Sequence, residues 1–189
     1  MSKPALCFMV DIESLGLDPH CLITVIAVTP FMSDHSWEGE PVKYNLNGSE
    51  QKNRTIDFNT VLWWFEQEDA AIKSMARSMR SGLNNRNMDM LLAMVYDLQA
   101  RAGEFGFQLN ACEFWFRGPQ FDCVAIETLL KSLGIKAPWK YDMVCDLRTH
   151  MRSGGVTLDD VTPSRSFLKH DAGEDTLFQI ECHRAAKQD

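Results

Sequence analysis

The sequence predicts a single-domain α/β protein. Three predicted strands come first, followed by helices, a strand, a helix and, after a loop, a last helix. The 189 residues fit one domain over residues 1–189, and 45% hydrophobic residues are enough for a packed core. No internal repeat, low-complexity tract or linker divides the chain.

The strands are predicted from short runs of apolar and β-branched residues. The first three cover residues 5–12, 22–29 and 42–46, with Gly16 and Pro19 in the first connection. A fourth strand covers residues 113–117 and stops at Gly118 and Pro119. A short edge strand is expected near residues 141–144.

The helices are predicted from apolar residues at helical spacing. The first helical segment begins at Asp57. The later helices cover residues 70–79, 87–102, 125–133 and 172–186, and a short helix opens at Asp146. Gly134 is predicted to cap the helix before it. Residues 153–166 carry two glycines, a proline and adjacent aspartates, which is typical of a mobile loop.

Composition narrows the function classes. The net charge of −7 argues against a protein that coats nucleic acid electrostatically, but not against an enzyme that holds one strand end through metal ions. No signal peptide or membrane span is recognised, so a soluble protein of the cytoplasm is expected. The six cysteines form no C-x-x-C pair, which favours buried thiols in a reducing compartment.

Two acidic residues, Asp11 and Glu13, end the first apolar strand. Period-two alternation places both side chains on one face of that strand. Two like charges on a buried strand repel each other and lose hydration unless a cation lies between them. The pair therefore suggests a divalent metal site. The alternative is two solvated acids at the end of a strand.

A second acid, Asp122, lies just after the fourth predicted strand, at the start of a helix. This junction is where metal sites and ligands commonly gather in α/β sheets. The alternative is that Asp122 only caps the helix.

A third acidic cluster precedes the last helix. Asp171 and Glu174 have the spacing of a capping box, with Asp171 at the N-cap. His170 and Asp175 then occupy the two positions whose side chains meet at a helix start. Asp175 would be free to ligate a metal ion, while His170 would face a water molecule bound there. The alternative is a surface histidine before an ordinary acidic first turn.

Together these clusters supply four carboxylates and one imidazole, from Asp11, Glu13, Asp122, Asp175 and His170. Four carboxylates suit two Mg²⁺ or Mn²⁺ ions about 4 Å apart, the arrangement used for in-line displacement at phosphodiesters. A histidine, with an unperturbed pKa of about 6.5, is suited to take a proton from water as general base.

These motifs resemble those of the DEDDh (DnaQ-like) 3′-5′ exonuclease superfamily. Residues 11–18, Phe121-Asp122 and His170 with Asp175 match its three motifs in order, over about residues 5–185. Trp63-Trp64, residues 115–122 and residues 146–149 are similar to the branch of phage-type exonuclease A and the Rv2179c-like exoribonucleases. The departures are Ser14, where threonine is common, and the extra acid Asp171 beside the histidine.

The resemblance implies an RNase H-like fold, with a mixed central sheet flanked by helices, and release of nucleoside monophosphates from single-stranded 3′ ends. It implies a homodimer as one possible assembly and, for a phage-encoded chain, the host cytoplasm. Ser14, Leu15, Gly16 and Leu17 would form the floor under the terminal nucleotide, although Gly16 is also consistent with a plain tight turn.

Several alternatives stay open at this point. The phage-type resemblance favours DNA over RNA, with an exoribonuclease as the second choice. A catalytically inactive nucleic-acid-binding protein of the same fold and an RNase H-like endonuclease are the others. Trp63 and Trp64 suggest base stacking or, preferably, one core and one partly exposed residue. Arg117 and Arg148 suggest phosphate contacts or structural partners of nearby acids.

Overall fold

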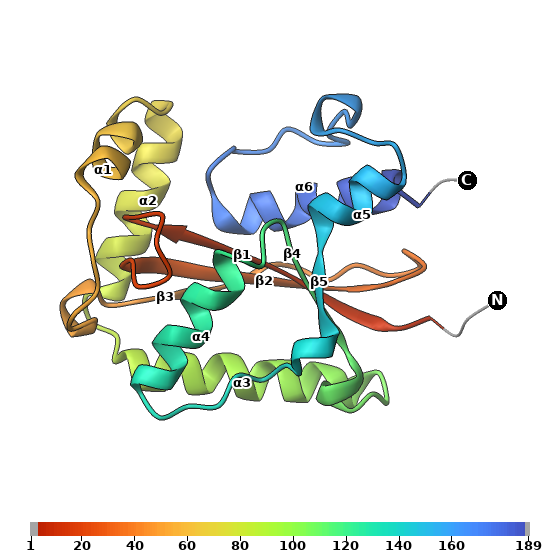
Figure 1. Cartoon of the computed structure of the whole chain (residues 1–189), viewed down its shortest axis with the longest axis horizontal. Helices are drawn as coiled ribbons and strands as arrows, with labels where there is room; N and C mark the ends of the chain where they lie inside the picture. The colour runs from red at the N-terminus through yellow and green to blue at the C-terminus, as the bar shows by residue number, and fades with distance from the viewer. Residues whose placement is uncertain (1–3, 188–189) are drawn as a thin grey trace.

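A five-stranded mixed sheet forms the centre of the computed structural model, which describes residues 4–187 (Figure 1). The strand order is β3-β2-β1-β4-β5, with β1 antiparallel to β2 and parallel to β4. The pairs β2–β3 and β4–β5 are antiparallel and parallel respectively. The strands are β1 Leu6–Ser14, β2 Ile23–Met32, β3 Val42–Asn45, β4 Glu113–Phe116 and β5 Val144–Asp146.

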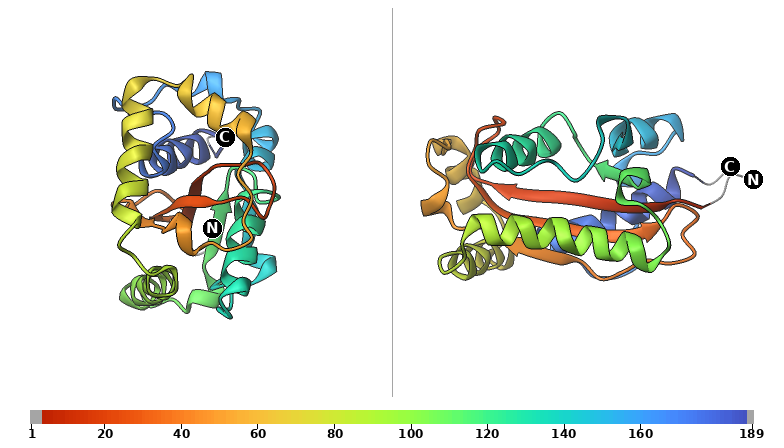
Figure 2. Two further views of the ribbon diagram at one scale, coloured as in Figure 1. Left: turned by 90° about the vertical axis from the view of Figure 1, so that its left-hand side faces the viewer. Right: turned by 90° about the horizontal axis from the view of Figure 1, so that it is seen from below.

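Helices cover both faces of this sheet. Helices α5 and α6 lie on one face and α3 on the other, where it runs along the strands (Figures 1 and 2). The helices are α1 Phe58–Phe65, α2 Asp69–Gly82, α3 Asn87–Glu104, α4 Asp122–Ser132, α5 Leu147–Ser153 and α6 Ala172–Ala185. The predicted α/β class is therefore confirmed, with a mixed sheet between layers of helices.

The alternation of side chains along β1 divides the core into two parts. Leu6, Phe8 and Val10 pack in the larger core cluster, which also contains buried residues of α3 and α4. Cys7 and Met9 point to the opposite face and pack with buried residues of α5 and α6. Because alternation continues along the strand, the next odd-numbered side chains also face the α6 side. These are the side chains of Asp11 and Glu13.

The start of α6 is anchored directly beside these two acids. Ala172, the first residue of α6, packs on Val25 and Ala27 of β2 in a small buried cluster. In the β1–β2 register these two residues lie opposite Glu13 and Asp11. The first turn of α6 therefore lies over the acidic end of β1.

A buried hydrogen bond holds the second turn of α6 on β2. The Thr29 and Thr176 hydroxyl oxygens lie 2.6 Å apart, and Thr176 also donates to the Gly173 carbonyl at 2.7 Å. Since Thr176 already donates its only hydroxyl hydrogen, Thr29 is the donor between the two side chains.

Several predicted boundaries differ from the structure, and α2, for example, ends at Gly82, three residues beyond its predicted end. β2 continues to Met32, three residues beyond the prediction, and α4 begins at Asp122, three residues before it. Residues 141–143 form a 3₁₀ turn instead of a strand, and β5 begins at Val144, which pairs with Phe114. Tyr141 is 91% exposed and Asp142 is also exposed, so this turn buries little surface against the sheet.

The predicted glycine cap is confirmed, and the predicted loop contains one short turn, while its mobility stays a prediction. Gly134 follows α4 with a φ of +71°, which a glycine adopts without strain. The segment after α5 contains a short 3₁₀ turn, Leu158–Asp160, whose start is capped by Thr157.

The six cysteines are free thiols, and five of them are buried. Within residues 4–187, none of the helices has the length and apolar character needed to cross a membrane.

Candidate active site

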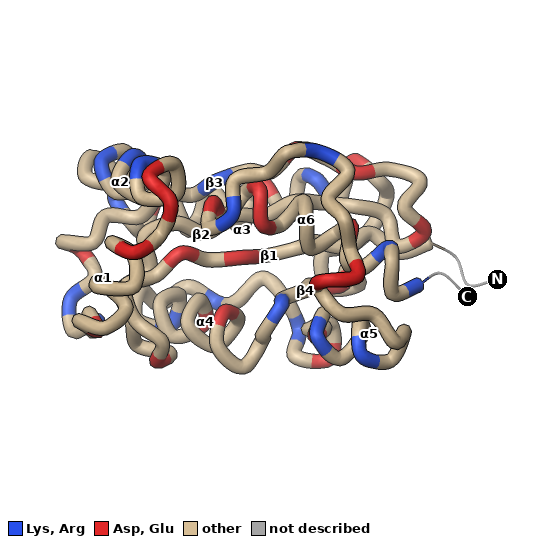
Figure 3. Tube along the Cα trace, turned by 90° about the horizontal axis from the view of Figure 1, so that it is seen from above, with Lys and Arg blue, Asp and Glu red and all other residues tan. Residues whose placement is uncertain are grey.

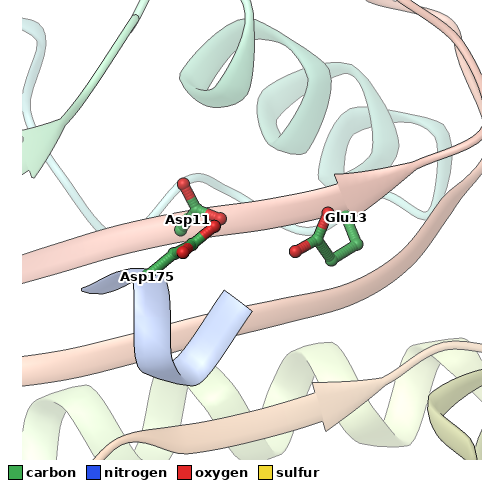
Figure 4. A group of neighbouring side chains, drawn as sticks. All are labelled: Asp11, Glu13 and Asp175. Atoms are coloured by element: carbon green, nitrogen blue, oxygen red, sulfur yellow. The ribbon is translucent and has the colours of Figure 1, made fainter. Parts of the chain in front are cut away.

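Three carboxylates from two elements converge at the centre of the sheet. Asp11 and Glu13 come from β1, and Asp175 from the first turn of α6 (Figure 4). One oxygen of each lies within 4.8 Å of the others, and these three form a group that could hold a metal ion. Residues 164 positions apart in the chain therefore meet, because α6 packs over the end of β1.

Asp122 lies close to this group but outside it. It is the first residue of α4, and Phe121 occupies the cap position without a side-chain hydrogen bond. Asp122 therefore does not act as the helix cap that the sequence left open. Its charge is near enough to raise the pKa of Asp11.

Burial shifts the pKa values of all four acids upwards, and repulsion from neighbouring site carboxylates adds to the shift for Asp11 and Glu13. For Asp11 and Glu13 the main cause is burial, followed by neighbouring carboxylates: Asp122 for Asp11, and Asp11 for Glu13. Burial raises the pKa of Asp122 to about 7, although Arg148 and Arg117 oppose the shift. Burial also raises the pKa of Asp175 to about 6.

The site has the chemistry of a cation site. Glu13 is only 9% exposed, and its buried Oε1 atom has no hydrogen-bond partner among the described residues. Asp11 receives a single side-chain hydrogen bond, from Gln179 Nε2 at 2.7 Å. Buried carboxylates with free lone pairs are the oxygen ligands that Mg²⁺ and Mn²⁺ prefer. These residues therefore fit a divalent cation.

His170 is held at the start of α6 by an unusual backbone conformation and by two tryptophans. Its φ is +64°, and its backbone N–H donates to Asp175 Oδ2 at 3.3 Å. The imidazole lies edge-on against Trp63, with ring centroids 4.9 Å apart, and against Trp64 at 6.1 Å. Burial, and then the nearby charge of Lys169, lower the pKa of His170.

Asp171, the extra acid beside His170, has structural partners. Its side chain accepts hydrogen bonds from the Gly173 and Glu174 amides, so it caps α6 as predicted. It also forms an ion pair with Lys43 and accepts a hydrogen bond from Ser74. Burial alone would raise its pKa, but the bonds from Lys43 and Ser74 lower it below the ordinary value.

A pocket of about 500 Å³ opens beside Glu13. Of the predicted floor residues, Ser14 and Leu17 line it, whereas Leu15 and Gly16 do not. Trp63 and Trp64 form part of its wall.

The two tryptophans divide as predicted into one buried and one exposed side chain. Trp64 is 6% exposed and its Nε1 donates to the Ser14 carbonyl at 3.1 Å, while Trp63 is 41% exposed. They nevertheless share the pocket wall and the contact with His170, which the preferred core interpretation did not predict.

Sequence reasoning also missed Gln179. It lies one helical turn after Asp175, so both side chains project from the same face of α6. The signal was this four-residue spacing, which becomes informative only once Asp175 is placed at the site.

Comparisons with known proteins identify a family of 3′-5′ exonucleases. The family model described as the 3′-5′ exoribonuclease Rv2179c-like domain matches residues 7–186. No curated protein matches the sequence at a significant level. Among solved structures, the crystal structure of cell-death related nuclease 4 (CRN-4) has a TM-score of 0.51 at 12% identity. The alignment covers 95% of this chain and 63% of that one. At this identity the similarity shows the fold alone, and it confirms the predicted nuclease fold.

Proposed function

The chain belongs to the Rv2179c-like 3′-5′ exoribonuclease domain family, and from this premise we propose that it removes nucleoside 5′-monophosphates from single-stranded 3′ ends. Membership of a 3′-5′ exonuclease family agrees with the resemblance seen in the sequence. The observation that carries the proposal is the convergence of Asp11, Glu13 and Asp175 beside an open pocket.

Asp11, Glu13 and Asp175, with Asp122 beside them, would hold two divalent cations, Mg²⁺ or Mn²⁺. Bound cations of this kind lower the pKa of water and stabilise the charge that develops on a phosphodiester. The protein fixes the carboxylates on a central strand and on two helix starts, so little rearrangement is needed when cations bind.

His170 is the proposed general base. Its lowered pKa keeps the imidazole neutral near pH 7, so that a ring nitrogen is able to accept the proton of the attacking water. The edge contact with Trp63 holds the ring, and the bond from the His170 amide to Asp175 holds the backbone of His170 beside that carboxylate. Asp171 would act as a positioning residue, because its charge is engaged by Lys43 and the α6 amides.

The pocket beside Glu13 would hold the terminal nucleoside. Leu17 and Trp63 offer exposed apolar surface there, 75% and 41% exposed respectively, and aromatic rings stack on any base. The family description supports RNA as the first substrate to test, whereas the phage-type resemblance favours DNA.

The test follows 5′-labelled single-stranded RNA and DNA of equal sequence with Mg²⁺, Mn²⁺ or EDTA. A ladder of shortened products that requires metal supports the proposal, and the faster polymer identifies the substrate. Asp11→Ala should abolish the ladder. Asp69→Ala, which removes an exposed carboxylate from α2, should leave it unchanged. Intact strands that remain bound to the wild-type chain would instead support a binding protein without catalysis.

A further inference from the structure

Three arginines line a second pocket, on the other side of the acidic cluster. Arg117 follows β4, and Arg148 and Arg152 lie one turn apart on α5, so that their side chains share a helix face. With residues 155–158, they enclose about 500 Å³. Figure 3 shows Lys and Arg segments gathered along α5, in a chain whose net charge is −7.

Within the described residues, none of these three arginines forms a close ion pair. Among residues 4–187, no ion pair within 4.0 Å and no side-chain hydrogen bond involves the guanidinium group of any of the three. Three unpaired cations around one pocket repel each other, so an anion that fills the pocket would be stabilised. Phosphate groups match the planar, two-pronged geometry of arginine.

Two of the arginines of this pocket lie close enough to the site carboxylates to influence their pKa values. Arg148 lies over Gly118, whose carbonyl accepts the Asp122 amide at 3.1 Å. Arg117 lowers the pKa of Asp11, Asp122 and Asp175, and Arg148 that of Asp122. Arg152 is not among the main influences on the pKa values of these acids. Its place in the pocket is therefore not explained by balancing the charge of the carboxylates.

The two pockets lie at opposite sides of the acidic group along the long axis. The tryptophan pocket adjoins α1 and the arginine pocket adjoins α5, with the acidic end of β1 between them (Figures 1 and 3). A strand with its 3′ nucleoside against Trp63 and its last phosphodiester at the carboxylates would extend its preceding nucleotides toward α5.

We propose that the pocket of Arg117, Arg148 and Arg152 binds backbone phosphates on the 5′ side of the scissile bond. This inference rests on the proposed exonuclease function. It makes the enzyme sensitive to strand length, because a dinucleotide has one internucleotide phosphate and leaves the arginine pocket empty. Phosphate contacts carry no base information, so the site would act equally on all sequences.

The test compares kcat/KM for a dinucleotide and for an octanucleotide of the polymer that the wild-type chain cleaves faster. Arg152→Gln should lower kcat/KM for the octanucleotide about three- to tenfold, through KM, and leave the dinucleotide unchanged. The logarithmic salt dependence of octanucleotide binding should become shallower by about 0.7. Arg148→Gln should act in the same direction, with an added effect on the dinucleotide through Asp122.

Two control variants distinguish the effect of the positive charge at position 152 from the effect of removing a positive charge elsewhere on the molecule. Arg152→Lys keeps the positive charge and should keep the salt dependence. Arg80→Gln removes a positive charge from α2, at the far end of the molecule from α5, and should change neither substrate.

If Arg152→Gln lowers kcat/KM equally for the dinucleotide and the octanucleotide, or for neither, the proposed role of the arginine pocket is wrong. If the wild-type chain cleaves neither substrate, the exonuclease proposal fails. The fluorescence anisotropy of a 5′-labelled octanucleotide then tests phosphate binding by the arginine pocket separately. Weaker binding by Arg152→Gln would support it, and unchanged binding would refute it.

Discussion

At the level of single residues, the site is a set of acids placed where their charges are unfavourable. Burial raises the pKa values of Asp11, Glu13, Asp122 and Asp175, and repulsion from the other site acids adds to the shift for Asp11 and Glu13. In the absence of divalent cations these buried acids therefore lower the stability of the folded protein, as functional residues commonly do.

Asp11→Asn should stabilise the protein in EDTA while abolishing activity. The amide keeps an oxygen to accept the bond from Gln179 and removes one of the repelling charges. We expect a gain of about 1–2 kcal/mol, or a rise in Tm of about 2–8 °C. Thermal unfolding in EDTA measures it, with Asp69→Asn on the exposed face of α2 as a neutral control. A lower Tm than wild type would contradict the electrostatic account.

Trp63→Leu should impair cleavage with little effect on stability. The indole is 41% exposed, lines the tryptophan pocket and contacts the His170 ring. Because base stacking on an aromatic ring contributes about 1–3 kcal/mol, kcat/KM should fall at least about fivefold. Steady-state cleavage measures this. Tyr96→Leu, on the exposed face of α3, is the matched control. Similar losses in both variants would count against a specific role for Trp63.

The sequence predicted these site residues unevenly. Asp11 and Glu13 were placed on one face because alternation along a strand is a local rule. That Asp175 joins them was suggested by the number of carboxylates a two-metal site needs and by a family resemblance, since no local rule brings together residues so far apart. The pocket role of Trp63 depends on how α1 packs beside Ser14, which is tertiary information.

At the level of elements, the site depends on how α6 is fixed to β2. Ala172 packs on Val25 and Ala27, and the next turn is held by the Thr29–Thr176 hydrogen bond. Both contacts place Asp175 over β1. The helix itself was predictable from its spacing and its Asp171 cap. Its docking on β2 was not, because the buried threonine pair leaves no periodic signal.

Thr176→Val should cost more stability than Thr29→Val. The first change leaves the Thr29 hydroxyl without its acceptor at 0% exposure, with an expected loss of about 1–3 kcal/mol. After the second change Thr176 still donates to the Gly173 carbonyl, so the loss should be smaller. The double variant removes the unpaired hydroxyl and should be more stable than Thr176→Val alone. Urea unfolding of the three variants measures these differences, and simple additivity would exclude this hydrogen-bond account.

At the scale of the whole molecule, distant segments meet in places that local sequence patterns do not reveal. His35 follows β2, His150 belongs to α5 and His183 to α6, yet the three rings form one cluster. Their positions in the sequence give no sign of this contact, because more than 30 residues separate each from the next. In the structure His183 Nδ1 lies 3.0 Å from His35 Nε2, and its ring stacks on His150. The cluster ties the end of β2 to both helices of that face.

Burial makes this histidine cluster sensitive to acid. It lowers the pKa of His183 to about 3 and that of His35 to about 4, so both stay neutral in the folded chain. An unfolded histidine has a pKa of about 6.5 and therefore binds more protons between these values. Stability is consequently full above pH 6.5 and falls as the pH drops toward the folded pKa. The site acids act in the opposite direction, because their raised pKa values favour folding on acidification.

His183→Phe separates these two opposing contributions. Its ring keeps the contacts with Trp115 and Phe31 but cannot take up a proton, and His35 loses its partner. Near pH 7.5 the variant should be less stable than wild type by about 1–2 kcal/mol. Below pH 6.5 the difference should shrink by up to about 1.4 kcal/mol per pH unit, since only wild type must keep His183 neutral. Urea unfolding in EDTA between pH 7.5 and 4.5 measures the two curves. Parallel curves would show that His183 does not contribute to the acid sensitivity.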